Sequence, residues 1–325
     1  MNPPYFIYIY LFFISFLITY FIVPKVILFC NKNNIKESPE SRKEHNYPMA
    51  RLGGLSIFLG TTISIILLLL INYFFGNWYI DFNKLVGLNL CSLFIFLIGL
   101  IDDLYNLKAY PRLFGQIVVA SLTYSLGVRI ELIDLNLFSD TGAFLFLPEV
   151  LSFLLTLIWI VGVINAINWI DGIDGLATTI ITLSALSFGF ISITLNQYIP
   201  AIISVSILGP SIAFLRYNWF PAKIFMGDGG SYFLGFNIAI IAMIYRSFDP
   251  LLFNPFQVIF LLAIPLFDMV FVTFKRLIKK VSPFLPDRNH YHHRMLKLGI
   301  NQKRIVLLSI IISLIFISIG MSISV

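Results

Sequence analysis

The sequence predicts an all-α integral membrane protein of about ten transmembrane helices, with both termini outside and a candidate active site in the cytoplasmic loops. The 325 residues are 58% hydrophobic and only 12% charged, whereas soluble domains carry about 25% charged residues. The apolar residues gather in long runs, and most basic residues lie between these runs on one side. Because no stretch between the runs is long enough to fold alone, we expect a single domain over residues 1–325.

A helix needs about 20 apolar residues to cross the ~30 Å core of a bilayer. The runs that meet or approach this length are 5–29, 53–75, 85–101, 112–128, 150–168, 176–195, 199–215, 231–247, 255–274 and 305–324. All Lys and Arg residues except Lys84, Arg129 and Arg246 fall in or beside the loops that follow odd-numbered runs. Short loops rich in Lys and Arg stay in the cytoplasm, so these loops are predicted to be cytoplasmic. On the outer side, residues 129–149 alternate in polarity and predict a small hairpin.

The composition argues against two classes of site. There is no basic stripe with interleaved aromatic residues, so we expect no nucleic acid among the partners. Cys30 and Cys91 lie in apolar runs and give neither a disulfide framework nor a cysteine-based metal site. The lipid bilayer is an expected partner, and the sequence leaves a homodimer open.

Four polar clusters end apolar runs on the predicted cytoplasmic side. The first is Asp102–Asp103, at the end of the third run. Two carboxylates at a water boundary suit Mg²⁺, which prefers oxygen ligands, and the alternative is a solvated helix end. Acidic residues at a helix C-terminus oppose the helix dipole, so capping does not explain the pair.

The second cluster has a polar residue at every third position, namely Asn165, Asn168, Asp171 and Asp174. On a turn of helix these four side chains would lie along one stripe. The glycine after each aspartate breaks the helix and lets a ligand approach the backbone. Polar groups at this depth are costly in lipid unless they are satisfied, so the cluster is either a ligand site or a structural network between helices.

The third cluster, Gly227, Asp228 and Ser231, precedes the eighth run. Asp and Ser are ordinary helix caps. The surrounding glycines would nevertheless leave backbone N–H groups free, and a free helix N-terminus is an anion site suited to a diphosphate.

The fourth cluster is His290, His292, His293 and Arg294, which holds three of the four histidines. Zinc is the competing interpretation, but there is no histidine pair at i and i+4 and no nearby cysteine. Arg294 suits phosphate oxygens through bidentate donation.

Two further residues lie outside these clusters. His45 is either a fifth element of the same site or part of a charged loop. Asp268, near the cytoplasmic end of the ninth run, is predicted to pair with Arg276 or a histidine. In this role it would orient a site residue without contacting the substrate itself.

Together these motifs resemble the polyprenyl-phosphate N-acetylhexosamine-1-phosphate transferases (glycosyltransferase family 4), which begin peptidoglycan, wall teichoic acid and O-antigen lipid-linked precursors. The matching stretches are Gly99–Asp103, Asn165–Ala177, Phe225–Ser231 and His290–Arg294. Their order and the ten-helix plan match too, so the resemblance covers almost the whole chain. The His-x-His-His-Arg form is similar to the teichoic acid and O-antigen branch, whereas the muramoyl-pentapeptide branch runs His-His-His.

The resemblance implies transfer of N-acetylhexosamine-1-phosphate, with GlcNAc-1-phosphate favoured, from a UDP-sugar to undecaprenyl phosphate at the bacterial cytoplasmic (inner) membrane. It implies Mg²⁺, with Mn²⁺ as an alternative, held by Asp228 with Asn168 beside it. The expected catalytic residues are Asp102 and Asp103 near the lipid phosphate and Asp171 and Asp174 near the nucleotide sugar. The residues expected to bind substrate are Asn165, His290, His292, His293, Arg294, His45, Gly227 and Ser231.

The expected reaction is attack of the lipid phosphate on the β-phosphorus of the UDP-sugar, with release of UMP. The second pKa of a phosphate ester is about 6, so proton removal by Asp102 contributes little near neutral pH. A covalent aspartyl-phosphate through Asp102 or Asp103 is left open. A polytopic membrane transporter is one alternative, although its site belongs near the middle of the membrane. A transferase of the same family that uses another UDP-N-acetylated sugar is the other.

Overall fold

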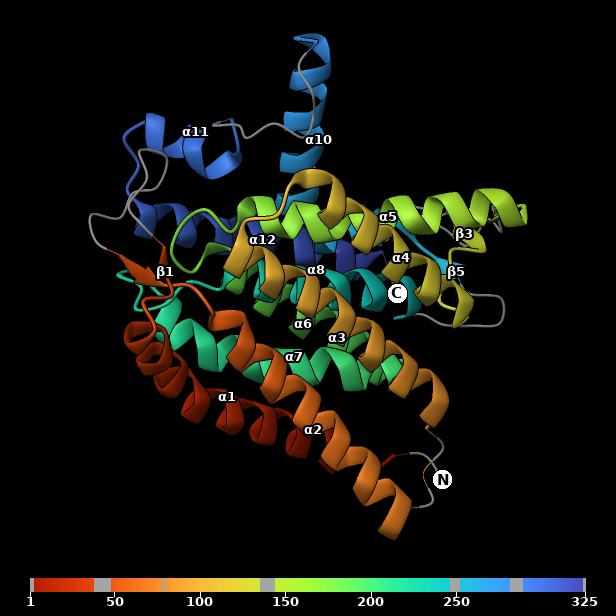
Figure 1. Cartoon of the computed structure of the whole chain (residues 1–325). Coiled ribbons are helices and arrows are strands. Elements are labelled where there is room, and N and C mark those ends of the chain that lie inside the picture. Colours follow the sequence, from red (N-terminus) through yellow and green to blue (C-terminus); the bar gives the residue numbers. More distant parts are fainter. Residues whose placement is uncertain are drawn as a thin grey trace.

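The computed structural model describes residues 3–37, 48–76, 78, 80–134, 144–245, 252–280 and 289–323, which form a helical bundle with two small sheets (Figure 1). The long helices are α1 (Phe6–Lys32), α2 (Gly53–Phe75), α3 (Phe82–Tyr105), α5 (Glu149–Ile170), α6 (Leu176–Thr194), α7 (Tyr198–Asn218), α8 (Gly227–Ile244) and α12 (Gln302–Ser322). The shorter helices are α4 (Ala109–Ser125), α9 (Pro255–Leu261), α10 (Ala263–Ile278) and α11 (Tyr291–Lys297).

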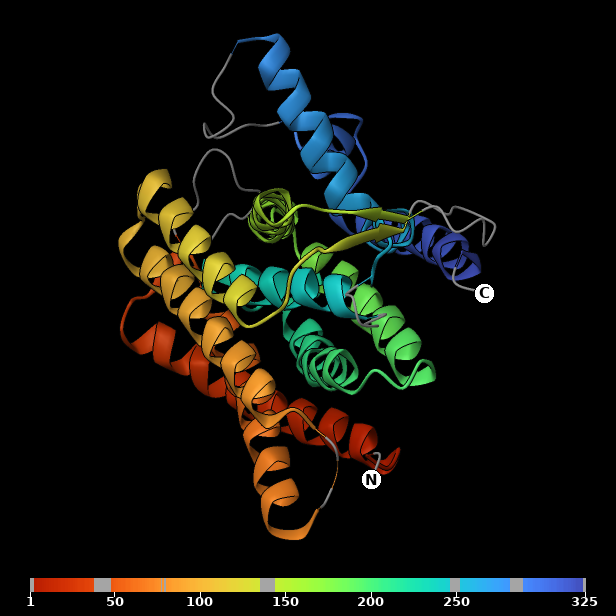
Figure 2. The ribbon, with the colours of Figure 1, turned by 90° about the vertical axis from the view of Figure 1, so that its right-hand side faces the viewer.

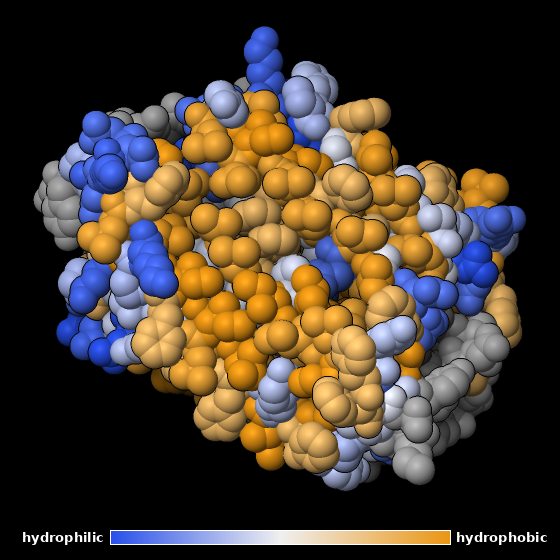
Figure 3. All heavy atoms as spheres, turned by 60° about the horizontal axis from the view of Figure 1, so that its bottom comes forward, coloured by the Kyte–Doolittle hydropathy of each residue, from blue (hydrophilic) through white to orange (hydrophobic). Residues whose placement is uncertain are grey.

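The bundle has the helices and the surface of a membrane protein. Within the described residues, eight helices are long and apolar enough to cross a membrane, or nine if the bent pair α9–α10 counts as one span. The predicted fourth run coincides with α4, whose 17 residues are at the lower limit for a crossing. Figure 3 shows a broad apolar surface with hydrophilic side chains toward both ends of that face. Such a surface is suited to lipid rather than to water.

Helix α8 lies at the centre of the bundle (Figures 1 and 2). It packs against α2, α3, α5, α6 and α7, and 89% of its most apolar stretch is buried, against 33% for α1 and 28% for α12. A helix that is apolar on all sides is stable in this central position. The polar N-terminus of α8 is thereby fixed among the ends of its neighbours.

The ninth predicted run, 255–274, is not one straight helix. It is divided into α9 and α10, which meet at Leu262 with a bend of 97°. Pro265 has no N–H to donate to the carbonyl of Leu261, and that carbonyl accepts a hydrogen bond from the Ser184 hydroxyl instead (3.0 Å). The predicted run is therefore present as a bent pair of helices, and α10 projects away from the bundle (Figures 1 and 2).

The two small sheets lie at opposite ends of the molecule. Strands β3 (Leu132–Asp134) and β4 (Phe144–Phe146) form the predicted antiparallel hairpin, to which β5 (Leu252–Phe253) adds a parallel strand that was not predicted. Strands β1 (Lys36–Glu37) and β2 (Met49–Ala50) pair at the end where α11 lies (Figure 1). The N and C labels both lie toward the side of the molecule where β3 lies (Figure 1).

Candidate active site

The segment that carries Arg51 is joined to the turn that begins α8. The N–H of Phe225 donates to the carbonyl of Ala50 (2.8 Å). Gly227 then has a φ of +75°, and a Cβ at this position would lie 2.4 Å from the carbonyl oxygen of Arg51. Only glycine tolerates this conformation and this close approach. The turn therefore fixes Arg51 beside Asp228.

Three carboxylates from two neighbouring helices form an acidic cluster, which consists of Asp102 and Asp103 of α3 and Asp228 of α8. Asp103 accepts hydrogen bonds from the backbone N–H groups of Asp228 (2.8 Å) and Gly229 (2.9 Å). It thus caps the N-terminus of α8 from another helix, where a negative charge is favourable. Because the Asp103 side chain is only 2% exposed, we infer that its main effect is to hold the two helices in register.

Asp102 is also buried and has donors on both oxygens. One oxygen accepts from the backbone N–H of Leu107 (2.8 Å). The other accepts from the Arg112 guanidinium (2.9 Å) and from the Tyr232 hydroxyl (3.1 Å). A general base needs an oxygen within reach of the proton that it removes. This arrangement favours a positioning role for Asp102, which holds Arg112.

Asp228 is the carboxylate of the acidic cluster that a ligand can reach. Its side chain is 18% exposed, and its Oδ1 accepts from the Asn168 amide (2.7 Å). The same amide nitrogen donates to the Ser231 hydroxyl (3.0 Å). A partly exposed carboxylate oxygen suits Mg²⁺, which is usually held by one or two carboxylates together with substrate phosphates. Among the described residues, no group of three His, Cys, Asp or Glu could hold a metal by itself.

Arg51 links two members of the acidic cluster. Its Nε lies 2.8 Å from Asp103 Oδ1, and its Nη2 lies 2.8 Å from Asp228 Oδ2. Its third nitrogen donates to the side chain of Asn106 (3.3 Å). Burial alone would lower the pKa of Arg51, but the two carboxylates outweigh it and raise this pKa above its ordinary value. The cluster therefore contains a permanent positive charge.

The segment 165–174 follows the predicted stripe only where it is helical. Asn165 and Asn168 lie on α5, where Asn165 donates to the side chain of Gln116 (2.7 Å). The helix ends at Ile170, so Asp171 is the residue after its last turn. Asp174 is buried and accepts from the backbone N–H of Ala222 (2.9 Å). The expectation of one continuous stripe is wrong for Asp174, because the chain leaves the helix before reaching it.

The histidine cluster, which consists of His290, His292, His293 and Arg294, lies at the start of α11 and is anchored to α10 by Asp268. This carboxylate is 2.9 Å from His290 Nδ1 and 3.2 Å from Arg294 Nη2. It also accepts from the backbone N–H of Tyr291 (2.6 Å). The predicted pairing of Asp268 with a histidine is confirmed, and Arg294 is an additional partner.

His292 is packed against the end of α5. A Cβ on Gly172 would lie 2.2 Å from His292 Nε2, so glycine is required for this contact. Burial, followed by the neighbouring His293 and His290, lowers the pKa of His292 to about 3. His292 is therefore neutral near pH 7. Nearby, the His290 ring lies 5.4 Å from that of Trp169, so the end of α5 contacts both clusters.

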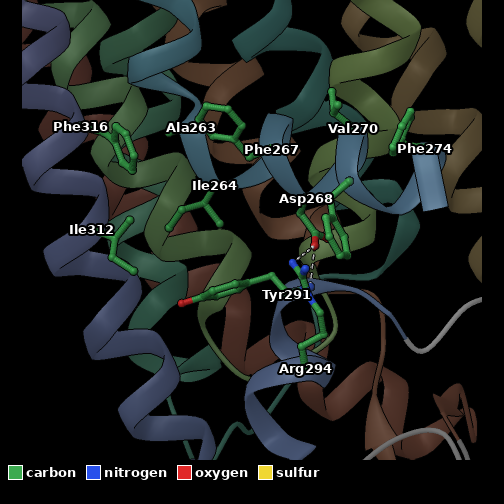
Figure 4. Close-up of a pocket in the computed structure, with 11 residues that line it drawn as sticks. Ala263, Ile264, Phe267, Asp268, Val270, Phe274, Tyr291, Arg294, Ile312 and Phe316 are labelled. Atoms are coloured by element: carbon green, nitrogen blue, oxygen red, sulfur yellow. Dashed lines mark hydrogen bonds and ion pairs between the residues drawn. The ribbon is translucent and has the colours of Figure 1, made fainter. Parts of the chain in front are cut away.

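An apolar groove of about 490 Å³ runs beside the histidine cluster (Figure 4). Its walls come from α10, α11 and α12, and its lining residues include Phe267, Phe271, Ile312 and Phe316. Asp268 and Arg294 line the same groove, and the Arg294 guanidinium lies 4.0 Å from the centre of the Phe271 ring. An apolar space with a few convergent polar groups is typical of a ligand site.

Most predicted site residues converge, but their partners were not foreseen. Asp103, Asn168, Gly227, Asp228 and Ser231 lie together, as do the histidines and Arg294, whereas His45 is outside the described residues. Sequence reasoning did not assign Arg51, Arg112, Tyr232 or Gln116 to the site. Arg51, Tyr232 and Gln116 lie at least 49 residues from the side chains that they contact, so local patterns carry no signal of these pairings. Arg112 is ten residues from Asp102, but the two residues lie on different helices.

Comparison with known proteins identifies the family. Residues 85–246 match the family model described as glycosyl transferase family 4. A relative in Bacillus subtilis, a probable undecaprenyl-phosphate N-acetylglucosaminyl 1-phosphate transferase, is 30% identical over 94% of this chain and 82% of its own length. The chain belongs to glycosyl transferase family 4.

Two further relatives support this assignment. A decaprenyl-phosphate N-acetylglucosaminephosphotransferase of Mycobacterium leprae is 32% identical over 90% of this chain and 77% of its own length. An undecaprenyl-phosphate alpha-N-acetylglucosaminyl 1-phosphate transferase of Pasteurella multocida is 33% identical over 85% and 75%. As a member of this family, the chain is a multi-pass membrane transferase, and the transporter alternative is set aside.

Proposed function

We propose that this family 4 member transfers GlcNAc-1-phosphate from UDP-GlcNAc to undecaprenyl phosphate at the cytoplasmic face of the bacterial membrane. The products are UMP and undecaprenyl diphospho-GlcNAc, a first lipid-linked intermediate of a cell-surface polysaccharide. The observation that carries the proposal is the position of Asp228, a reachable carboxylate held by Asn168 and Arg51. The names of the relatives favour this donor.

The charges around the acidic cluster suit two phosphate-bearing substrates. Arg51 pairs with Asp103 and Asp228, and Arg112 pairs with Asp102. Two guanidinium groups beside a carboxylate give both an anion site and a cation site within one cluster. Preorganised charges of this kind stabilise the charge that develops in phosphoryl transfer.

In the proposed reaction, an oxygen of the lipid phosphate forms a bond to the β-phosphorus of the UDP-sugar. The bond from that phosphorus to the oxygen bridging to UMP breaks, and UMP leaves with the electron pair. The attacking phosphate is mostly a dianion near neutral pH, because its second pKa is about 6. No base is then required, which agrees with an Asp102 whose two oxygens already have donors.

Direct attack is favoured over an aspartyl-phosphate intermediate. The side chains of Asp102 and Asp103 are only 3% and 2% exposed, and both accept several hydrogen bonds. A carboxylate in this state is a poor nucleophile. Inversion at phosphorus, measured with a chirally labelled donor, is the expected stereochemical result; retention would establish the covalent route.

Mg²⁺ is the proposed cofactor, with Mn²⁺ as the alternative ion. Asp228 would hold the ion, and the Asn168 side chain lies beside it. Such an ion neutralises charge on diphosphate oxygens and on a departing phosphate. Removal of divalent ions with EDTA should therefore stop UMP release, and added Mg²⁺ should restore it.

The apolar groove between α10 and α12 is suited to the isoprenoid chain of the acceptor. Its lining is almost entirely apolar, and Arg294 at its border could contact a phosphate (Figure 4). In the relatives' names the acceptor is a polyprenyl phosphate, which has this combination of a long apolar chain and an anionic head. We expect Phe267→Trp to raise the KM for undecaprenyl phosphate and to leave the KM for UDP-GlcNAc unchanged.

The decisive experiment is a donor panel with the purified protein. The protein in detergent would be supplied with undecaprenyl phosphate, Mg²⁺ and one UDP-sugar at a time, and UMP would be measured. Release of UMP with UDP-GlcNAc supports the proposal. Release only with another UDP-N-acetylated sugar would correct the donor, and no release with any donor would reject the transferase activity.

A further inference from the structure

Arg51 occupies the carboxylate that the proposed function assigns to the metal. Its Nη2 lies 2.8 Å from Asp228 Oδ2, while its Nε lies 2.8 Å from Asp103 Oδ1. The two contacts use different nitrogens of one planar group, so the contact to Asp228 can be lost while the contact to Asp103 remains. The Arg51 guanidinium thus pairs with one buried carboxylate, Asp103, and with one partly exposed carboxylate, Asp228.

The two ion pairs differ in how easily they separate. The Asp103 side chain is 2% exposed and also accepts two backbone N–H groups at the start of α8, which holds it in place. Asp228 is 18% exposed and shares its other oxygen with Asn168. A partly solvated pair exchanges for water or another cation at lower cost than a buried one. The ion pair between Arg51 and Asp228 is therefore the one that separates more easily.

The backbone around Arg51 keeps the guanidinium within reach after such a separation. The preceding residue, Ala50, accepts a hydrogen bond from Phe225, and the N–H of Gly53 donates to the carbonyl of Phe225 (3.0 Å). The segment 50–53 is thus tied to the strand-like stretch before α8. Only the side chain has freedom to turn.

We propose that Arg51 is an internal counter-ion that neutralises Asp228 while no metal is bound and gives up this carboxylate when a divalent cation binds there. The released Nη2 donors then face the polar opening of the cluster and are free to bind a phosphate oxygen of the substrate. The inference rests on the proposed function, because that function supplies the cation and the diphosphate.

Competition of this kind has a measurable consequence without any turnover. A divalent cation that binds only the folded protein raises its melting temperature in a concentration-dependent way. In the wild type, Mg²⁺ must displace one charge-assisted contact of Arg51, and a difference of about 1.4 kcal/mol corresponds to a tenfold change in affinity. In Arg51→Gln we expect the Mg²⁺ concentration at half-maximal stabilisation to fall about tenfold. The metal-free variant should melt at a lower temperature than the metal-free wild type.

The matched control is Arg112→Gln, which also removes one guanidinium from the acidic cluster. Arg112 pairs with Asp102 and not with Asp228. Its replacement therefore lowers the local positive charge but removes no competitor for the Asp228 oxygen that would bind the metal. Arg51→Lys gives a second test, because a lysine keeps the charge but cannot bridge two carboxylates with a planar fork. It should shift the Mg²⁺ midpoint in the same direction by a smaller factor, and it covers the case in which Arg51→Gln does not fold.

The outcomes separate failure of this inference from failure of the proposed function. A tenfold tighter response in Arg51→Gln, with a much smaller change in Arg112→Gln, supports the inference. An unchanged or weaker Mg²⁺ response in both Arg51 variants would overturn it, and so would equal tightening in Arg51→Gln and Arg112→Gln. If the wild type does not respond to Mg²⁺ and releases no UMP, the metal site and the proposed function are themselves wrong.

Discussion

Replacement of Asp268 with alanine should detach α11 from α10. This carboxylate accepts from His290, from the backbone N–H of Tyr291 and from Arg294, and the residue is 3% exposed. A buried polar group that loses its partner costs about 1–3 kcal/mol, so the first two donors together cost about 2–6 kcal/mol. The pair with Arg294 is more exposed and adds less than about 1 kcal/mol.

Hydrogen–deuterium exchange of residues 289–300 measures this detachment directly. Loss of about 2 kcal/mol corresponds to roughly 30-fold less protection of the α11 amides. UMP release should fall with it, because the histidine cluster is no longer held beside α5. Asp268→Asn keeps an acceptor for the Tyr291 N–H and should lose less protection.

The matched control is Asp81→Ala, which removes another aspartate that accepts from a backbone N–H. Asp81 caps α3 through the N–H of Lys84 (3.0 Å) in an exposed position. Its loss should cost about 1 kcal/mol and leave exchange of α11 unchanged. If Asp268→Ala exchanges like the wild type in α11, the anchoring role derived from these contacts is wrong.

Three further predictions concern single residues of the two clusters. Asp228→Ala should abolish UMP release while the protein still purifies as a folded species by size-exclusion chromatography; wild-type turnover would refute the metal assignment. The pKa of His292 is about 3 in the folded protein and about 6.5 when unfolded, so between these values the unfolded state binds more protons and stability falls as the pH is lowered. His292→Gln should therefore lose less stability than the wild type from about pH 7 to about pH 5 in thermal melts, and equal losses would show that His292 is not buried in its neutral form. Gly172→Ala introduces a methyl group 2.2 Å from His292 Nε2 and should cost about 1–3 kcal/mol, with faster exchange in α11; an unchanged melting temperature would contradict this contact.

The membrane fold was predictable because it depends on properties that can be counted directly along the sequence. The length of an apolar run and the distribution of Lys and Arg need no knowledge of tertiary contacts. The break between α9 and α10 was missed for a local reason, since Pro265 was read as part of an apolar run. A proline near the start of a helix and one that ends a helix have the same hydropathy, and here the hydroxyl of Ser184 stabilises the break from another helix.

The candidate site was predictable by residue type but not by pairing. Glycines and carboxylates at run ends mark Asp103 and Asp228, and the structure joins them through the start of α8. The cations that balance them come from elsewhere, as Arg51 is 177 residues from Asp228 along the chain. A basic residue in a cytoplasmic loop has the same local signature whether it orients the membrane protein or neutralises a carboxylate. Only the tertiary contacts distinguish the two roles.

The three aspartates of the acidic cluster show why a shared motif does not give a shared role. Asp103 accepts hydrogen bonds from backbone N–H groups of α8, so the loss of Asp103 should act first on helix packing. Asp102 holds Arg112, so the loss of Asp102 should act on the position of this positive charge. Asp228 alone combines exposure with a displaceable cation. Burial and the identity of each donor therefore order the three residues by chemical role, from structural support to ligand contact.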